Sequence, residues 1–182
     1  SARLRYDGRR YPVPEALRTS APFYMKGWTV LAPMTDMANR VAAAPEAAAR
    51  GVLSSEAYVS LLSAAASEEE PAEALAAQTE QLRGAFRLAT GANRYAAMER
   101  LWSAGGTPNQ SYAAMVATAR AAAALPPSTD VGGDPWQLLG SMLTAGYDEN
   151  VIAWVPTVSV GSRAWGVLAV GSPRPLTGMS AG

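Results

Sequence analysis

Histidine and cysteine are both absent from this chain of 182 residues. Without them the chain alone cannot form a Ser-His-Asp triad, a cysteine nucleophile, a zinc site with nitrogen and sulfur ligands, a histidine-ligated haem or a disulfide. Cysteine usage therefore assigns no redox compartment, and the localisation stays open. From the sequence we predict no catalytic, metal-binding or cofactor-binding residue, and we lean away from an enzyme.

Lysine is scarce and long apolar runs are missing. Lys26 is the single lysine among 15 basic residues, and 15 acidic residues bring the formal net charge to zero. A neutral chain is a poor candidate for a general polyanion binder. No stretch approaches the roughly 18 uninterrupted apolar residues of a transmembrane helix, so we expect no membrane contact. A hydrophobic content of 49% is nevertheless sufficient for a single globular domain with a core.

Alanine is abundant, with 38 residues, and it has the highest helix propensity of all residues. Capping residues and glycine or proline stops predict about five helices between residues 34 and 146. The clearest prediction is a helix that begins at a capping box of Ser67 and Glu70, runs to about Thr90 and stops at Gly91. The other predicted starts are Thr35 or Asp36, Ser54 or Ser55, Thr107 with Pro108, and Asp134 with Pro135.

Both ends of the chain are predicted to be β-structure. Residues 1–32 form an extended arm, with a hairpin around Asp7-Gly8 and a candidate strand over 27–31. Residues 151–170 are rich in Val, Ile and Trp and predict a second hairpin that turns at Gly161-Ser162. The expected fold class is α+β, mainly α: a single domain over 1–182 with an arm (1–32), a helical body (34–146), a hairpin (151–170) and a tail (171–182). The alternative is one segment of a larger processed protein.

The C-terminal hairpin has one resemblance. Its strand, its glycine-containing turn and the segment Ala-Trp-Gly-Val-Leu-Ala-Val over residues 164–170 resemble the paired central strands of small-molecule-sensing domains of the GAF type. The resemblance covers about 20 residues and implies a β-hairpin at this place. No function is carried over from it.

Basic residues gather at the N-terminus, where tyrosines lie between them. This pattern fits a nucleic-acid arm, but a charged hairpin edge that blocks aggregation or pairs with a partner subunit explains it equally well. Nucleic acid is therefore not the favoured partner. The expected interaction surface consists of Arg3, Arg5, Arg9, Arg10, Tyr11, Trp154 and Trp165.

Three functions stay open on the sequence. Alanine-rich helices bury little area each and depend on neighbours, and hairpin edges accept added strands, so we favour a structural or interaction protein. Such a protein would be a subunit of a larger assembly of shell, capsid or scaffold type, with other protein chains or copies of itself as partners. The first alternative is a small-molecule binding or sensing module that uses the C-terminal hairpin and adjacent helices. The second is one chain of a self-processed hydrolase.

Overall fold

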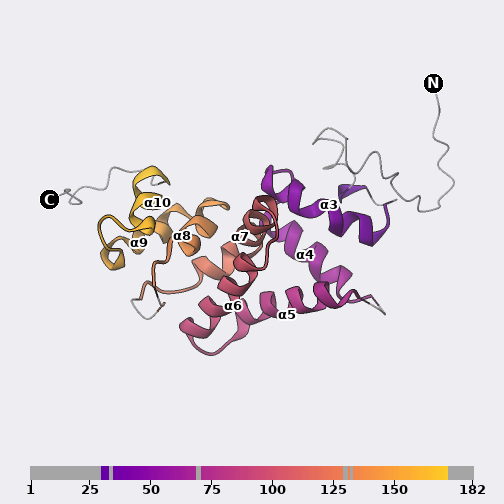
Figure 1. Cartoon of the computed structure of the whole chain (residues 1–182), viewed down its shortest axis with the longest axis horizontal. Coiled ribbons are helices and arrows are strands. Elements are labelled where there is room, and N and C mark those ends of the chain that lie inside the picture. The colour runs from indigo at the N-terminus through magenta and orange to yellow at the C-terminus, as the bar shows by residue number, and fades with distance from the viewer. Residues whose placement is uncertain (1–29, 33–34, 69–70, 129–130, 132, 172–182) are drawn as a thin grey trace, which may run out of the picture.

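The structure is a computed structural model that describes residues 30–32, 35–68, 71–128, 131 and 133–171. Over these ranges the chain is helical and contains no strand, so the fold is mainly α (Figure 1). The elements are α3 (Met37–Ala49), α4 (Ser55–Ala65), α5 (Glu73–Arg87), α6 (Gly91–Ser103), α7 (Pro108–Ala123), α8 (Trp136–Leu143), α9 (Asp148–Ala153), the 3-10 turn η1 (Val155–Thr157) and α10 (Arg163–Gly171).

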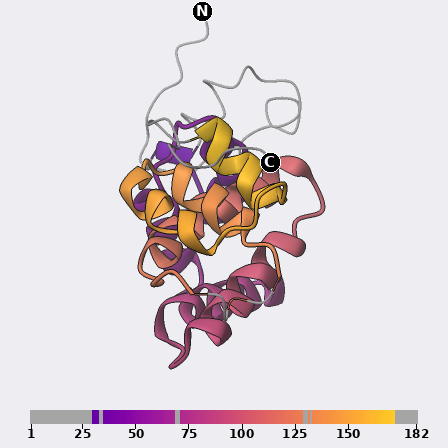
Figure 2. The same ribbon diagram turned by 90° about the vertical axis from the view of Figure 1, so that its left-hand side faces the viewer.

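Helix α7 is the centre of the molecule. It contacts α3, α4, α5, α6 and α8. In Figure 1, α3, α4 and α5 extend to one side of it, and α8, α9 and α10 to the other. Turned by a quarter (Figure 2), the molecule has α10 near one end and the magenta α5 with α6 at the opposite end.

The alanines of α7 explain its central position. A helix that packs against several neighbours must be apolar over most of its surface, and small side chains let those neighbours come close. Eight of its residues are buried, and six of them are alanine. They are Ala113, Ala114, Val116, Ala117, Thr118, Ala119, Ala121 and Ala122.

A buried polar contact joins α6, α7 and α8. The indole Nε1 of Trp102 donates to the hydroxyl of Thr118 over 2.9 Å, and this hydroxyl lies 3.1 Å from that of Ser141. The Ser141 hydroxyl donates in turn to the carbonyl oxygen of Met115 over 2.7 Å. Buried polar groups are costly unless they are paired, so these bonds fix how the three helices sit together.

An arginine fixes the position of α5 relative to α7. Arg94, near the start of α6, donates from Nε to the carbonyl oxygen of Ala85 at 2.8 Å and from a terminal nitrogen to that of Ala121 at 3.3 Å. Ala85 lies in the last turn of α5 and Ala121 in that of α7, where carbonyl groups lack helical partners. The C-terminal ends of the two helices are thereby held by one side chain.

The predicted C-terminal hairpin is wrong. Residues 151–170 instead form the end of α9, the 3-10 turn η1 and most of α10. The buried residues follow helical spacings: Val151, Trp154 and Val158 in the first part, and Ala164 with Leu168 in the second. An apolar run of this length fits a buried helix as well as a strand. Here the segment is helical, and its helices α9 and α10 pack against α8. The resemblance to GAF-type strands therefore does not hold.

Several predicted helix limits are also corrected. Ser67 lies just past the end of α4 and does not cap the next helix. Its hydroxyl donates to the carbonyl of Ser63 within α4, and α5 starts only at Glu73. Gly91 does not stop α5 but begins α6, with Thr90 as its N-cap. The strand predicted over 27–31 is helical at Val30 and Leu31, where the structure describes it.

Other starts are confirmed. Asp36, Ser54 and Thr107 each accept a hydrogen bond from the backbone N–H three residues later, as an N-cap does. Asp134 is different. Its carboxylate does not cap α8 but accepts from the N–H groups of Arg163 at 2.8 Å and Ala164 at 3.0 Å, so it caps the distant α10.

The hairpin predicted around Asp7-Gly8 lies outside the described residues. Among the helices that the structure does describe, none combines the length and the apolar character that crossing a membrane requires. The same ranges hold no group of three or more acidic residues placed to bind a metal ion.

Candidate functional site

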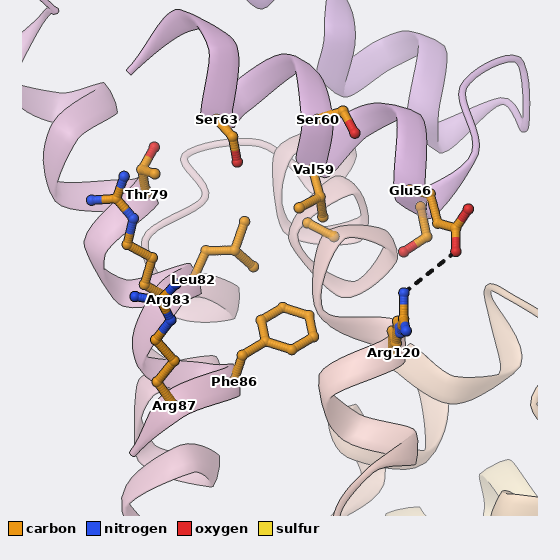
Figure 3. A pocket seen from close by; sticks show the side chains of 12 residues that line it. Glu56, Val59, Ser60, Ser63, Thr79, Leu82, Arg83, Phe86, Arg87 and Arg120 are labelled. Atoms are coloured by element: carbon orange, nitrogen blue, oxygen red, sulfur yellow. Dashed lines mark ion pairs between the residues drawn. The ribbon is translucent and has the colours of Figure 1, made fainter. Parts of the chain in front are cut away.

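A cleft of about 620 Å3 lies between α4, α5 and α7 (Figure 3). Each helix contributes one stripe of residues at the spacing of helical turns. Its lining residues are Ser55, Glu56, Val59, Ser60 and Ser63 from α4, Thr79, Leu82, Arg83, Phe86 and Arg87 from α5, and Ala117 with Arg120 from α7.

The base of the cleft is apolar. Leu82 and Ala117 are buried, and Val59 is partly buried and packs against the core. Phe86 is 38% exposed, and Figure 3 shows its ring directed into the opening between α5 and α7. An exposed aromatic ring beside a hollow supplies a large contact area for a partner, because few torsions are frozen when it is covered.

The rim of the cleft is basic. Arg83 and Arg87 stand one turn apart on α5, and Arg120 lies across the opening on α7 (Figure 3). One acidic residue, Glu56, lines the same cleft. Positive charge on two opposite sides of an apolar base favours a ligand that carries negative charge at more than one point.

The ion pairs at the rim are weak. Arg120 approaches Glu56 at 3.6 Å, and both side chains are more than half exposed. Arg83 pairs with Glu80 of its own helix at 3.5 Å in a similarly open setting. Exposed pairs of this kind stabilise a protein little, so a ligand can replace the glutamates at small cost. Arg87 has no ion-pair partner among the residues that the structure describes.

Serine and threonine hydroxyls complete the polar part of the lining. Ser60 and Ser63 of α4 point toward the opening in Figure 3. Thr79 is buried, and its hydroxyl donates to the carbonyl oxygen of Leu75 one turn earlier, so it is satisfied within its own helix. The serines are the hydroxyls left to bind a ligand.

The residues expected from the sequence to form an interaction surface do not meet at this cleft. Arg3, Arg5, Arg9, Arg10 and Tyr11 lie outside the described residues. Trp154 is 1% exposed and belongs to the core. Trp165 is partly buried against the core, and its indole nitrogen is buried without a hydrogen-bond partner in the described part of the chain.

Sequence reasoning missed the arginines of the cleft. Arg83 and Arg87 lie near the C-terminal end of α5, where positive charge stabilises a helix whether or not it lines a site. Their spacing around Phe86 was the one available signal, because it places a ring and two cations on adjoining faces of one helix. Arg120 comes from a helix far along the chain, and only the packing of α7 brings it near.

Comparison with known proteins adds no family to these observations. No protein-family model, curated protein or solved structure matches this chain.

Proposed function

We propose that this chain is a helical protein-interaction module, and that it binds an acidic segment of a partner chain in the cleft between α4, α5 and α7. The observation that carries the proposal is the placement of Arg83 and Arg87 on one side of an apolar base and of Arg120 on the other. Like the function favoured from the sequence, it is a function through protein–protein contacts, with the cleft as the proposed contact surface.

The open form of the cleft and the position of its charges favour an extended segment as the ligand. The cleft is open rather than closed, and its charges stand at the edges rather than together at one point. A compact anion such as a single phosphate is best held by convergent donors. A segment with carboxylates on both sides of an apolar residue matches this arrangement better, since the apolar residue covers Phe86 while the carboxylates meet the arginines.

The proposal is tested with a synthetic peptide of alternating glutamate and leucine, and its glutamine counterpart serves as the uncharged probe. Binding is followed by fluorescence anisotropy. The glutamate peptide should bind the unmodified chain and lose about tenfold in affinity in the double variant Arg87→Gln/Arg120→Gln, which corresponds to about 1.4 kcal/mol. The affinity should also fall as salt is added, because exposed charges are screened.

The matched control is Arg50→Gln, which removes an exposed arginine at the end of α3 that lines neither this cleft nor the second one described below. It should leave peptide binding unchanged. Equal affinities for the two peptides, or an equal loss in the control and the double variant, would overturn the proposal.

A further inference from the structure

A second cleft, of about 520 Å3, lies on the other side of α4 and α5. At 100° per residue, Ala77 and Gln81 project from the side of α5 opposite to its first-cleft residues, and Tyr58 and Leu62 of α4 are turned from theirs by about a third of a turn. The wall between the two clefts is thus formed by α4 and α5. Helices α3, α6 and α7 supply the rest of the lining of the second cleft, which is open to solvent.

Most of this second cleft is apolar. Helix α3 contributes Val41 and Pro45, α4 contributes Leu62 and the ring of Tyr58, and α6 contributes Leu101. Small-molecule sites in proteins share this character: a concave apolar surface of some hundreds of Å3 with a few placed polar groups.

The polar groups of the second cleft are three amides and one cation. Gln78 and Gln81 extend from adjacent turns of α5, Gln110 from the first turn of α7, and Arg100 from α6. The oxygen of the Gln110 amide accepts a hydrogen bond from the hydroxyl of Thr107 at 3.1 Å, which leaves its nitrogen to donate. Each amide can give or take a hydrogen bond, so together they match an amide group of a ligand.

Tyr58 fixes one of these amides. Its side chain is buried, and burial raises the pKa of its hydroxyl, while a hydrogen bond with the side chain of Gln78 acts in the opposite direction. The phenol is therefore neutral at physiological pH and positions the Gln78 side chain.

The charge in the second cleft has one sign. Arg100 lines it, and none of its described lining residues is acidic. Arg100 has no ion-pair partner in the described ranges, in contrast to Arg83 and Arg120 of the first cleft. A carboxylate on a bound molecule would supply the missing counter-charge through a charge-assisted pair.

We propose that the cleft between α3, α4, α5, α6 and α7 binds a small amphipathic carboxylic acid that carries an amide. Its apolar part lies along Val41, Leu62 and Leu101, its amide bonds with the glutamines, and its carboxylate meets Arg100. This inference is independent of the proposed protein partner, because the two clefts share no lining residue.

The test uses N-octanoylglycine, which has an apolar chain, an amide and a carboxylate, and its methyl ester, which lacks the charge. Both are titrated into the unmodified chain by isothermal calorimetry. The acid should bind about tenfold more tightly than the ester, as expected when one charge-assisted contact is lost. In Arg100→Gln the two affinities should become equal.

A filling variant tests the location. Ala77→Phe places a ring into the cleft from α5 and should abolish binding of both probes, whereas Ala76→Phe, at the neighbouring exposed position outside the lining, should bind as the unmodified chain does. Arg87→Gln in the other cleft should also have no effect. Absence of binding, an ester as tight as the acid, or equal loss in Ala76→Phe and Ala77→Phe would each overturn the inference.

Discussion

At the scale of single residues, the contact between Trp102 and Thr118 joins α6 to α7 within the core. Trp102 is 2% exposed and Thr118 is fully buried, so water cannot replace either partner. The Thr118 hydroxyl also donates to the carbonyl of Ala114 at 2.8 Å and therefore serves its own helix and the tryptophan together. Removing the hydroxyl leaves an indole N–H in the core without an acceptor.

Thr118→Val should therefore lower the free energy of unfolding by about 1–3 kcal/mol, the usual cost of a buried polar group left unsatisfied. Urea unfolding followed by circular dichroism measures it. Thr144→Val is the matched control, because the hydroxyl of Thr144 bonds to the nearby carbonyl of Ser141 and is partly exposed. When Trp102 is replaced by phenylalanine, the Thr118 substitution should cost less than it does alone. Strictly additive losses would contradict the contact.

Tyr58 gives the molecule a pH dependence on the alkaline side. Burial raises the pKa of its hydroxyl above the ordinary 10.0, so the folded state keeps the proton where the unfolded state releases it. The resulting stability is fully present below about pH 10 and is lost as pH rises beyond it.

Tyr58→Phe should therefore make unfolding less sensitive to pH above about 10. Urea midpoints at about pH 8 and about pH 11 measure the effect. Tyr112→Phe, at a tyrosine that is 42% exposed, should leave the pH dependence as it was. A pH dependence that is the same in Tyr58→Phe and in the unmodified chain would contradict this assignment.

At the scale of elements, the sequence predicted some helix starts that depend on a local cap but missed Thr90, the N-cap of α6, which it took as the end of the preceding helix. Ser54 and Thr107 act within three residues of themselves, and such short-range bonds can be recognised from the order of residues alone. The capping box at Ser67 fails because the chain leaves α4 there, and Ser67 bonds back to Ser63. A local pattern does not reveal whether a hydroxyl serves the helix before it or the helix after it.

The C-terminal elements depended on packing. Valine and tryptophan favour strands by propensity, but this preference is weak compared with burial. Trp154, Val151 and Leu168 bury their side chains in the core as helices place them. The carboxylate of Asp134, which the sequence places before α8, is used by α10. No local reading could have found a cap that acts over so many residues.

Asp134→Ala should destabilise α10 locally by about 1 kcal/mol, because two N–H groups at its start lose their acceptor. Hydrogen–deuterium exchange should become faster in α10, while α4 stays protected. Glu99→Ala, at an exposed acidic residue of α6, is the control and should leave exchange in α10 unchanged. Unaltered protection of α10 in Asp134→Ala would show that the cap is not needed there.

At the scale of the whole molecule, both clefts result from the way α7 and Arg94 hold α4, α5 and α6 together. The sequence indicated a helical body with an alanine-rich interior but not the clefts, because their residues come from helices that are distant in the chain. The absence of histidine and cysteine removed many catalysts from consideration. The exposed arginines of the two clefts provide the charge that both proposals use.

The central claim is that an acidic segment binds between Arg83, Arg87 and Arg120. Arginine Nε–H resonances of the isotope-labelled chain test it most directly, during titration with the peptide of alternating glutamate and leucine. The account predicts that these three resonances shift with a common affinity, while that of Arg94, which is bonded to the carbonyl of Ala85, stays in place. Shifts confined to other arginines, or none at saturating peptide, would contradict it.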